Sequence, residues 1–160
     1  MRGAIGAFLA LALVVAASAA RSDEAEDRAA VLEAVQDLFN AMATADAELA
    51  TRVLIPDGQL VAVTETEDGV EHRIWSHAEF VEFVGSREAE VVERMWDPTI
   101  RIDGAVATLH AGYDFHRDGV FSHCGIDVFT LLRAAEGWRI SGGTFTREAG
   151  PCPDNPLPEL

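Results

Sequence analysis

The chain has 160 residues, with 12 basic and 27 acidic side chains and a formal net charge of −15. All of the basic residues are arginines. A surface this acidic repels phosphate backbones, which argues against nucleic-acid binding. An acidic substrate would need a local basic exception, and the sequence shows no cluster of arginines. The charge is otherwise typical of a protein that stays in solution.

The N-terminus predicts a cleaved secretory leader. Arg2 precedes an apolar run, and small residues around Ser18 fit a signal-peptidase site. The alternative is an N-terminal membrane anchor, although the run is short for a membrane span. We therefore expect a periplasmic or secreted protein without membrane attachment after cleavage. The predicted leader, single domain and Pro-rich tail are residues 1–20, 21–150 and 151–160.

Hydrophobic periodicity predicts the order helix, helix, two strands, helix, four strands. The first helix is Ser22 to Met42, and a second, short helix is capped by Asp46 and ends before the turn Ile55–Gly58. A capping box of Ser76 and Glu79 begins the third helix, whereas the charged segment 86–95 has no clear pattern. The strands are expected at residues 59–65, 70–76, 96–102, 105–116, 120–133 and 138–147. The fold class is therefore α+β, with a strongly curved antiparallel sheet wrapped around the N-terminal helices as a cone-shaped barrel.

Strict alternation along the last four strands separates an apolar inner face from a mixed outer face. The outer face carries polar groups such as His110, together with the apolar Ile126 and Val128. It is expected to face solvent or a second protomer, because Ile126 and Val128 need to be covered. Small residues on the inner face leave room for a pocket. A register slip or bulge would exchange the two faces for a whole strand. The inner face and the first helix supply the expected ligand-binding residues Phe39, Trp96, Phe115, Phe129 and Thr144.

Three inner-face residues are candidate catalytic groups, namely Tyr113, His123 and Asp127. Tyr113 is expected opposite His123, whereas Asp127 lies about 13 Å from His123 along one strand. Apolar walls would raise the pKa of Asp127 and suit it to general acid or base work, while Tyr113 and His123 could stabilise an oxyanion. The alternative is structural: Asp127 bonded to the hydroxyls of Thr144 or Thr146, and His123 bonded to the Tyr113 hydroxyl.

The outer face offers weaker candidates. His110, Asp114 and His116 share one strand, but His110 and His116 are expected about 20 Å apart, which is too far for both to bind one metal ion. We predict neither a metal site nor a cofactor. Cys124 and Cys152 in an exported chain are expected to form a disulfide, and the alternative is a buried and an exposed free thiol.

The segments YDFHRDGVFSHCGIDVFTLLR and GWRISGGTFTREAGPC, with AVLEAVQDLFNAM in the first helix, resemble the SnoaL-like branch of the nuclear-transport-factor-2-like (NTF2-like) superfamily. The resemblance extends over residues 23–152. It implies a cone-shaped α+β barrel with an internal pocket, often dimeric through the outer sheet face. Relatives include ketosteroid isomerases and polyketide cyclases that work without cofactors, and many members have no known activity. Phe39 stands in a first helix that lacks the tyrosine of ketosteroid isomerases.

Three functions follow as hypotheses. The first is an exported protein that binds a small apolar or aromatic molecule in the cone pocket. The second is a cofactor-free isomerase, cyclase or dehydratase that uses Asp127, His123 and Tyr113. The third is a protein-interaction subunit that uses the outer sheet face.

Overall fold

The computed structural model describes residues 5–152 and 154–160, with side chains from Glu24 onward. Its elements follow the predicted order of helix, helix, two strands, helix and four strands. The helices are α1 (Ile5–Thr44), α2 (Ala47–Val53) and α3 (His77–Ser86). The strands are β1 (Leu54–Thr66), β2 (Gly69–Ser76), β3 (Val91–Asp103), β4 (Val106–Arg117), β5 (Val120–Ala134) and β6 (Gly137–Thr146).

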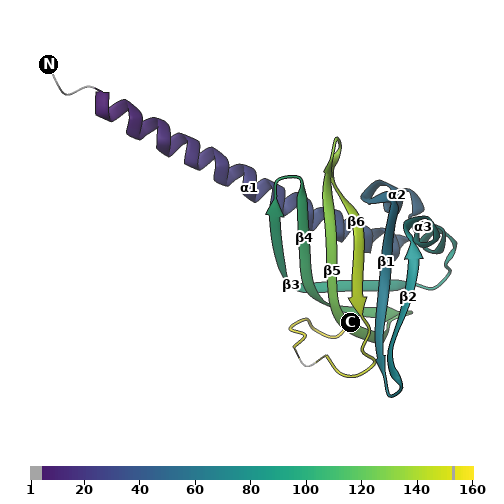
Figure 1. Cartoon of the computed structure of the whole chain (residues 1–160). Coiled ribbons are helices and arrows are strands. Elements are labelled where there is room, and N and C mark those ends of the chain that lie inside the picture. The colour runs from purple at the N-terminus through teal and green to yellow at the C-terminus, as the bar shows by residue number, and fades with distance from the viewer. Residues whose placement is uncertain (1–4, 153) are drawn as a thin grey trace.

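The predicted leader falls on residues of which at most the backbone is described, so its cleavage stays a prediction. Figure 1 shows the N-terminal part of α1 continuing well past the sheet. Among the described residues, no helix combines the length and the apolar character needed to cross a membrane.

The six strands form one curved, unclosed sheet in the order β2-β1-β6-β5-β4-β3. All neighbouring strands are antiparallel except β1 and β6, which are parallel. The C-terminal half of α1 crosses one face of the sheet, and α2 and α3 lie near the β1–β2 end (Figure 1). The α+β class is as predicted, and the open edges at β2 and β3 leave the cone unsealed.

The core forms where the apolar stripe of α1 meets the inner face of the sheet. The stripe is almost fully buried and consists of Val31, Val35, Leu38, Phe39 and Met42. It packs against Leu109, Leu131 and Ile140, each 0% exposed. Burying one such side chain contributes about 1.5–3 kcal/mol, so this contact fixes the inner face of the sheet.

The helix ends follow local sequence rules. Asp46 caps α2 by accepting a hydrogen bond from the Leu49 amide at 2.8 Å. Ser76 and Glu79 form the predicted capping box of α3, because each side chain bonds the other residue's amide. The predicted turn at Ile55–Gly58 is instead part of β1, where the register with β6 shifts between Leu54 and Gln59.

Bulges break the strict alternation and place Trp96 and Thr144 on the outer face, contrary to the prediction. In β3 the register shifts between Trp96 and Thr99, and the Trp96 ring fills the space beside Gly112, where an added Cβ would lie 2.3 Å away. In β6 a shift lets Thr144 pair with Val128, and Thr144 is exposed. Neither residue lines the interior, because one extra residue in a strand reverses every side chain beyond it.

The β4–β5 hairpin pairs two residues away from the predicted register. Tyr113 lies opposite Gly125, and His123 lies opposite Phe115. A displacement of two residues keeps all these residues on the inner face. Phe121 is different, because a shift beside it pairs it with His116 on the outer face, where it is 40% exposed.

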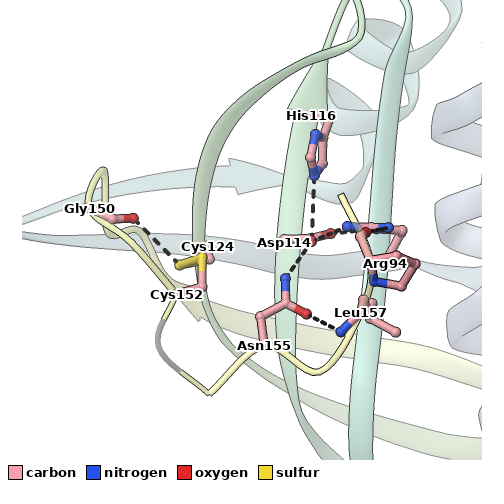
Figure 2. A network of polar contacts seen from close by, with 9 residues as sticks. Arg94, Asp114, His116, Cys124, Gly150, Cys152, Asn155 and Leu157 are labelled. Atoms are coloured by element: carbon pink, nitrogen blue, oxygen red, sulfur yellow. Dashed lines mark hydrogen bonds and ion pairs between the residues drawn. A yellow bond between two sulfur atoms is a disulfide. The ribbon is translucent and has the colours of Figure 1, made fainter. Parts of the chain in front are cut away.

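The C-terminal tail is fixed across the outer face of the sheet (Figure 2). The predicted disulfide between Cys124 and Cys152 is present. Beyond it, Asn155 donates to Asp114 at 2.7 Å, and Arg94 donates to the Pro158 carbonyl at 2.8 Å. The tail therefore covers part of the face that the sequence analysis left to solvent or a second protomer.

Asp114 and His116 belong to the group of residues that holds the C-terminal tail against the sheet. Asp114 is 1% exposed and accepts two hydrogen bonds from Arg94, at 2.9 and 2.5 Å. His116 lies 3.5 Å from the same carboxylate (Figure 2). Hydrogen bonds from Arg94 and Asn155 hold the pKa of Asp114 below its usual range against the opposing effect of burial. The group is thus a buried ion pair with a structural role.

Candidate functional site

A cavity of about 320 Å³ lies between the inner face of the sheet and the helices. The three candidate catalytic residues, Tyr113, His123 and Asp127, all line it. Of the five expected ligand-binding residues, Phe39, Phe115 and Phe129 line it, whereas Trp96 and Thr144 do not. Further aromatic walls come from elements that the sequence analysis did not single out, namely Trp75, Phe80, Phe83 and Phe145.

Asp127 is the buried polar centre of the cavity. It pairs with Ala111 on β4 and Phe145 on β6, and it is 1% exposed. Among residues 24–152 and 154–160, neither carboxylate oxygen has a hydrogen-bond partner other than the neighbouring acid Glu93. Burial raises the pKa of Asp127 to about 7. The expected bonds to the threonine hydroxyls are not made, since the Thr146 hydroxyl accepts from the Ile126 amide.

Glu93 on β3 faces Asp127 and completes a carboxyl pair that the sequence analysis missed. It lies opposite Phe115 and lines the same cavity. Burial raises the pKa of Glu93 well above its ordinary value, and the charge of Asp127 and a hydrogen bond to it raise the pKa further. Asp127 is buried and Glu93 is partly buried. Two adjacent carboxyls with so little access to water cannot both ionise easily, so the pair shares a proton near neutral pH.

Glu93 was missed because residues 86–95 were not assigned to a strand. The alternation extrapolated from Ile100 was also interrupted by the bulge at Asp97, whose φ is +49°. A usable signal was present, because Pro98 inside a strand commonly marks a bulge. Moving the register by one residue there would have turned Glu93 inward.

Tyr113 contributes a wall and no free donor. Its hydroxyl donates to the Thr146 carbonyl at 2.6 Å, and the residue is 1% exposed. Burial raises the pKa of Tyr113 far above its ordinary value, and the nearby acids Glu93 and Asp127 add to this. The hydroxyl proton is therefore engaged with the backbone, which weakens the expectation that it stabilises an oxyanion.

His123 lies next to Tyr113 in the wall of the cavity. Its ring stacks on Phe115 with centroids 4.9 Å apart, and it meets the Tyr113 ring edge-on at 5.9 Å. Nδ1 lies 3.0 Å from the Ser122 hydroxyl, which replaces the expected bond to Tyr113. Burial, followed by the charge of Arg147, lowers the pKa of His123 to about 4. The imidazole is therefore neutral at physiological pH.

Three arginines also reach this cavity, although the sequence showed no arginine cluster. Arg73 comes from β2, Arg117 from the end of β4, and Arg147 from the residue after β6. They are separated by 30 or more positions in the sequence. They come to one site only in the folded sheet.

The arrangement combines three kinds of chemistry. The aromatic walls can enclose a flat apolar body. The Glu93–Asp127 pair can accept hydrogen bonds and exchange a proton. The arginines can contact negative charge at the cavity edge.

Comparison with known proteins places this architecture in a recognised group. A model of the family described as "Putative lumazine-binding" matches residues 26–146. No curated protein matches the chain.

Solved structures share the fold at low sequence identity. An NTF2-like protein with a cystatin-like fold from Novosphingobium aromaticivorans has a TM-score of 0.65 at 18% identity, covering 84% of this chain and 90% of that chain. An NTF2-like superfamily protein from Salmonella enterica has a TM-score of 0.63 at 15% identity, covering 82% and 99%. A protein described as a "putative aromatic ring hydroxylase", also from N. aromaticivorans, has a TM-score of 0.59 at 18% identity, covering 76% and 89%. These likenesses show the fold alone.

Proposed function

Since this chain belongs to the family described as "Putative lumazine-binding" and has the NTF2-like fold, we propose that it binds a small, flat aromatic molecule in the cavity. The observation that carries the proposal is Asp127, which is 1% exposed and, among the described residues, has only the neighbouring acid Glu93 as a possible donor. One hydrogen bond to Glu93 leaves the other lone pairs of this buried carboxyl group unsatisfied, which costs free energy. A ligand that brings an N–H or O–H group to the carboxyl pair removes that cost.

The shape of the cavity supports the same class of ligand. Trp75 stacks on Phe145 with centroids 6.2 Å apart and an interplanar angle of 12°, and Phe39 lies 6.3 Å from Phe129. Both pairs line the cavity. A flat ring bound against them is removed from water and gains aromatic contacts. A lumazine, which is a flat nitrogen heterocycle with N–H groups, has both the shape and the donors.

Calorimetric titration with matched probes tests this proposal. Lumazine and 2-naphthol carry a donor, whereas 2-methoxynaphthalene has the naphthol body without one. We expect saturable binding of the two donor probes and roughly tenfold weaker binding of the methoxy compound, about the worth of one hydrogen bond to a charged group. Asp127→Asn should reduce that preference.

Thr144→Val is the matched control, because Thr144 lies on the outer face. It should leave all three affinities unchanged. Absence of binding by every probe would overturn the proposal. An effect of Thr144→Val as large as that of Asp127→Asn would place the ligand elsewhere.

Proton-transfer catalysis is the second candidate function. The observation that favours it is the carboxyl pair, in which the pKa of Asp127 is raised to about 7 and so lies near the working pH of a general base. His123 lines the same cavity, is neutral, and can donate or accept a hydrogen bond. This is the cofactor-free isomerase, cyclase or dehydratase hypothesis, with Glu93 joining Asp127 in place of Tyr113.

Exchange of C–H protons with solvent tests for catalysis. 2-Tetralone is a flat bicyclic ketone with acidic protons next to its carbonyl, and NMR in D₂O follows their replacement. An enzyme of this kind should accelerate exchange over buffer, and Asp127→Asn should abolish the acceleration. Exchange at the buffer rate, with 2-tetralone shown to bind, would leave the protein a binder only.

Export and self-association complete the proposal. The disulfide between Cys124 and Cys152 is compatible with an oxidising compartment, periplasmic or extracellular. A homodimer through the outer sheet face would cover Ile126 and Val128, which are 37% and 40% exposed. Intact mass of protein from the periplasm would report leader cleavage, and light scattering would report the dimer. A monomer without a copurifying protein would argue against the interaction-subunit hypothesis as well.

A further inference from the structure

We infer that the mouth of this cavity binds an oxyanion, so that the natural ligand is a flat aromatic molecule with a hydrogen-bond donor at one end and a carboxylate or phosphate at the other. The inference rests on the proposed function, since it concerns the same cavity. It adds the charge of the ligand and the direction in which the ligand lies.

Three arginines from separate parts of the sheet line this cavity. Arg73, Arg117 and Arg147 all line it, and all three are exposed residues, so they lie where the cavity opens to solvent. Asp127, in contrast, is 1% exposed. The cavity therefore has an acidic inner end and a basic outer end.

The guanidinium donors at the mouth are not consumed by protein carboxylates. Among the described side chains, no carboxylate lies within 4.0 Å of Arg73 or Arg147, and Arg117 makes only a 3.8 Å contact with the exposed Asp118. Elsewhere the same residue type is paired closely, as Arg133 is with Asp27 at 2.5 Å. Free donors at a cavity mouth are suited to a ligand oxyanion.

Two of these arginines interact with residues that line the cavity. The Arg73 guanidinium lies over the Trp75 ring, 4.5 Å from its centroid, and Trp75 is a cavity wall. The charge of Arg147 reaches inside, because it helps to lower the pKa of His123 after the larger effect of burial. An oxyanion bound between them would keep contact with both the aromatic wall and the positive charge.

The overall negative charge of the chain bears on why arginines are placed at the cavity mouth. With a formal net charge of −15, the chain repels anions at long range. A site for an anion therefore needs local positive charge. The rim arginines do not serve to neutralise Glu93 or Asp127, since no ion pair joins the two groups among residues 24–152 and 154–160.

There is also room for a projecting group. A second hollow, of about 640 Å³, adjoins the cavity and shares Ser122, His123 and Arg147 with it. An oxyanion attached to a ring inside the cavity can extend past His123 into this space and meet Arg147. The ligand's donor would then point inward to the carboxyl pair.

Calorimetric titration with three probes of one scaffold tests the inference. 6-Hydroxy-2-naphthoate and 6-hydroxy-2-naphthyl phosphate carry an oxyanion opposite the hydroxyl donor, and 6-hydroxy-2-naphthamide is their neutral counterpart. We expect at least one anion to bind about tenfold more tightly than the amide, with the difference shrinking as salt is added. The tighter anion identifies the oxyanion.

Variants assign the effect to the mouth. Arg73→Gln and Arg147→Gln should each weaken binding of the preferred anion about fivefold and change the amide less than about twofold. Arg101→Gln is the matched control: Arg101 is an exposed arginine of β3 outside the cavity lining, so the same charge change there should alter neither affinity.

The outcomes separate this inference from the proposed function. If the amide binds as tightly as both anions, or if Arg101→Gln acts as strongly as the rim variants, the oxyanion site is refuted while aromatic binding stands. If none of the three probes binds, and lumazine and 2-naphthol do not bind either, aromatic binding itself fails and the oxyanion site fails with it.

Discussion

Asp127 and Asp114 are two buried aspartates with different neighbours, and they allow the effect of those neighbours on stability to be compared. Both aspartates are 1% exposed. Asp127 faces another acid, whereas Asp114 is held by Arg94. Replacement of either by asparagine removes one carboxylate with little change in shape. We expect the two substitutions to change stability in opposite directions at neutral and alkaline pH.

The magnitude for Asp127 follows from proton linkage. Its pKa in the folded state is about 7, against 3.8 for the free side chain. Between these values the folded form holds a proton that the unfolded form has lost, so the free energy of unfolding falls as pH rises through this window and levels off above it. At about 1.4 kcal/mol per pH unit, the whole loss is about 4 kcal/mol at most.

An asparagine side chain cannot ionise, so Asp127→Asn should remove that slope. The variant should match the wild type near about pH 4 and exceed it by up to about 4 kcal/mol near about pH 8. Glu93→Gln should act in the same direction, because the two carboxyls share one proton. Asp114→Asn should instead destabilise by about 3 kcal/mol at both pH values, since it leaves the partly buried Arg94 without its counter-charge.

Urea denaturation of each variant at the two pH values gives the free energies directly. Asp103→Asn, at an exposed position, controls for the general effect of one fewer negative charge on an acidic chain. If Asp127→Asn destabilised the protein at about pH 8, or only matched Asp103→Asn, the carboxyl pair would not be the strained group that the structure indicates.

Three further substitutions test local features. Replacing both Cys124 and Cys152 by serine should lower the free energy of unfolding by about 3–4 kcal/mol, because the bridge closes a loop with a sequence separation of 28. Urea titration would measure this, with intact mass as a control, and an unchanged free energy of unfolding would argue against the bridge. Gly125→Ala should lower the melting temperature strongly, since an added Cβ would lie 2.2 Å from the Thr146 carbonyl; an unchanged melting curve would contradict the β4–β5 register. Ser76→Ala should cost about 1 kcal/mol through loss of the α3 capping box, measured by urea titration; a loss above about 3 kcal/mol would imply a larger role.

Much of the fold follows from local sequence patterns. The apolar stripe of α1 has the 3.6-residue period, and the caps at Asp46 and Ser76 use short-range hydrogen bonds. The inner-face positions of Tyr113, His123 and Asp127 followed from alternation, and a two-residue error in the hairpin register did not change them. Two cysteines in a chain with a predicted secretory leader were enough to predict their bridge.

The composition of the site depended on the tertiary structure. Bulges near Asp97 and Ser141 moved Trp96 and Thr144 to the outer face and turned Glu93 inward. Hydrophobic period alone does not locate such insertions, because their position is set by pairing between strands that are distant in sequence.

The sequence by itself determined the order and type of the helices and strands, since caps, turns and periodicity act over a few neighbouring positions. Only the tertiary structure brought Glu93 to Asp127, and Arg73 to Arg147 at the cavity mouth. These groups meet because the sheet curves and its registers shift, and both effects arise from the packing of the whole domain rather than from any one segment.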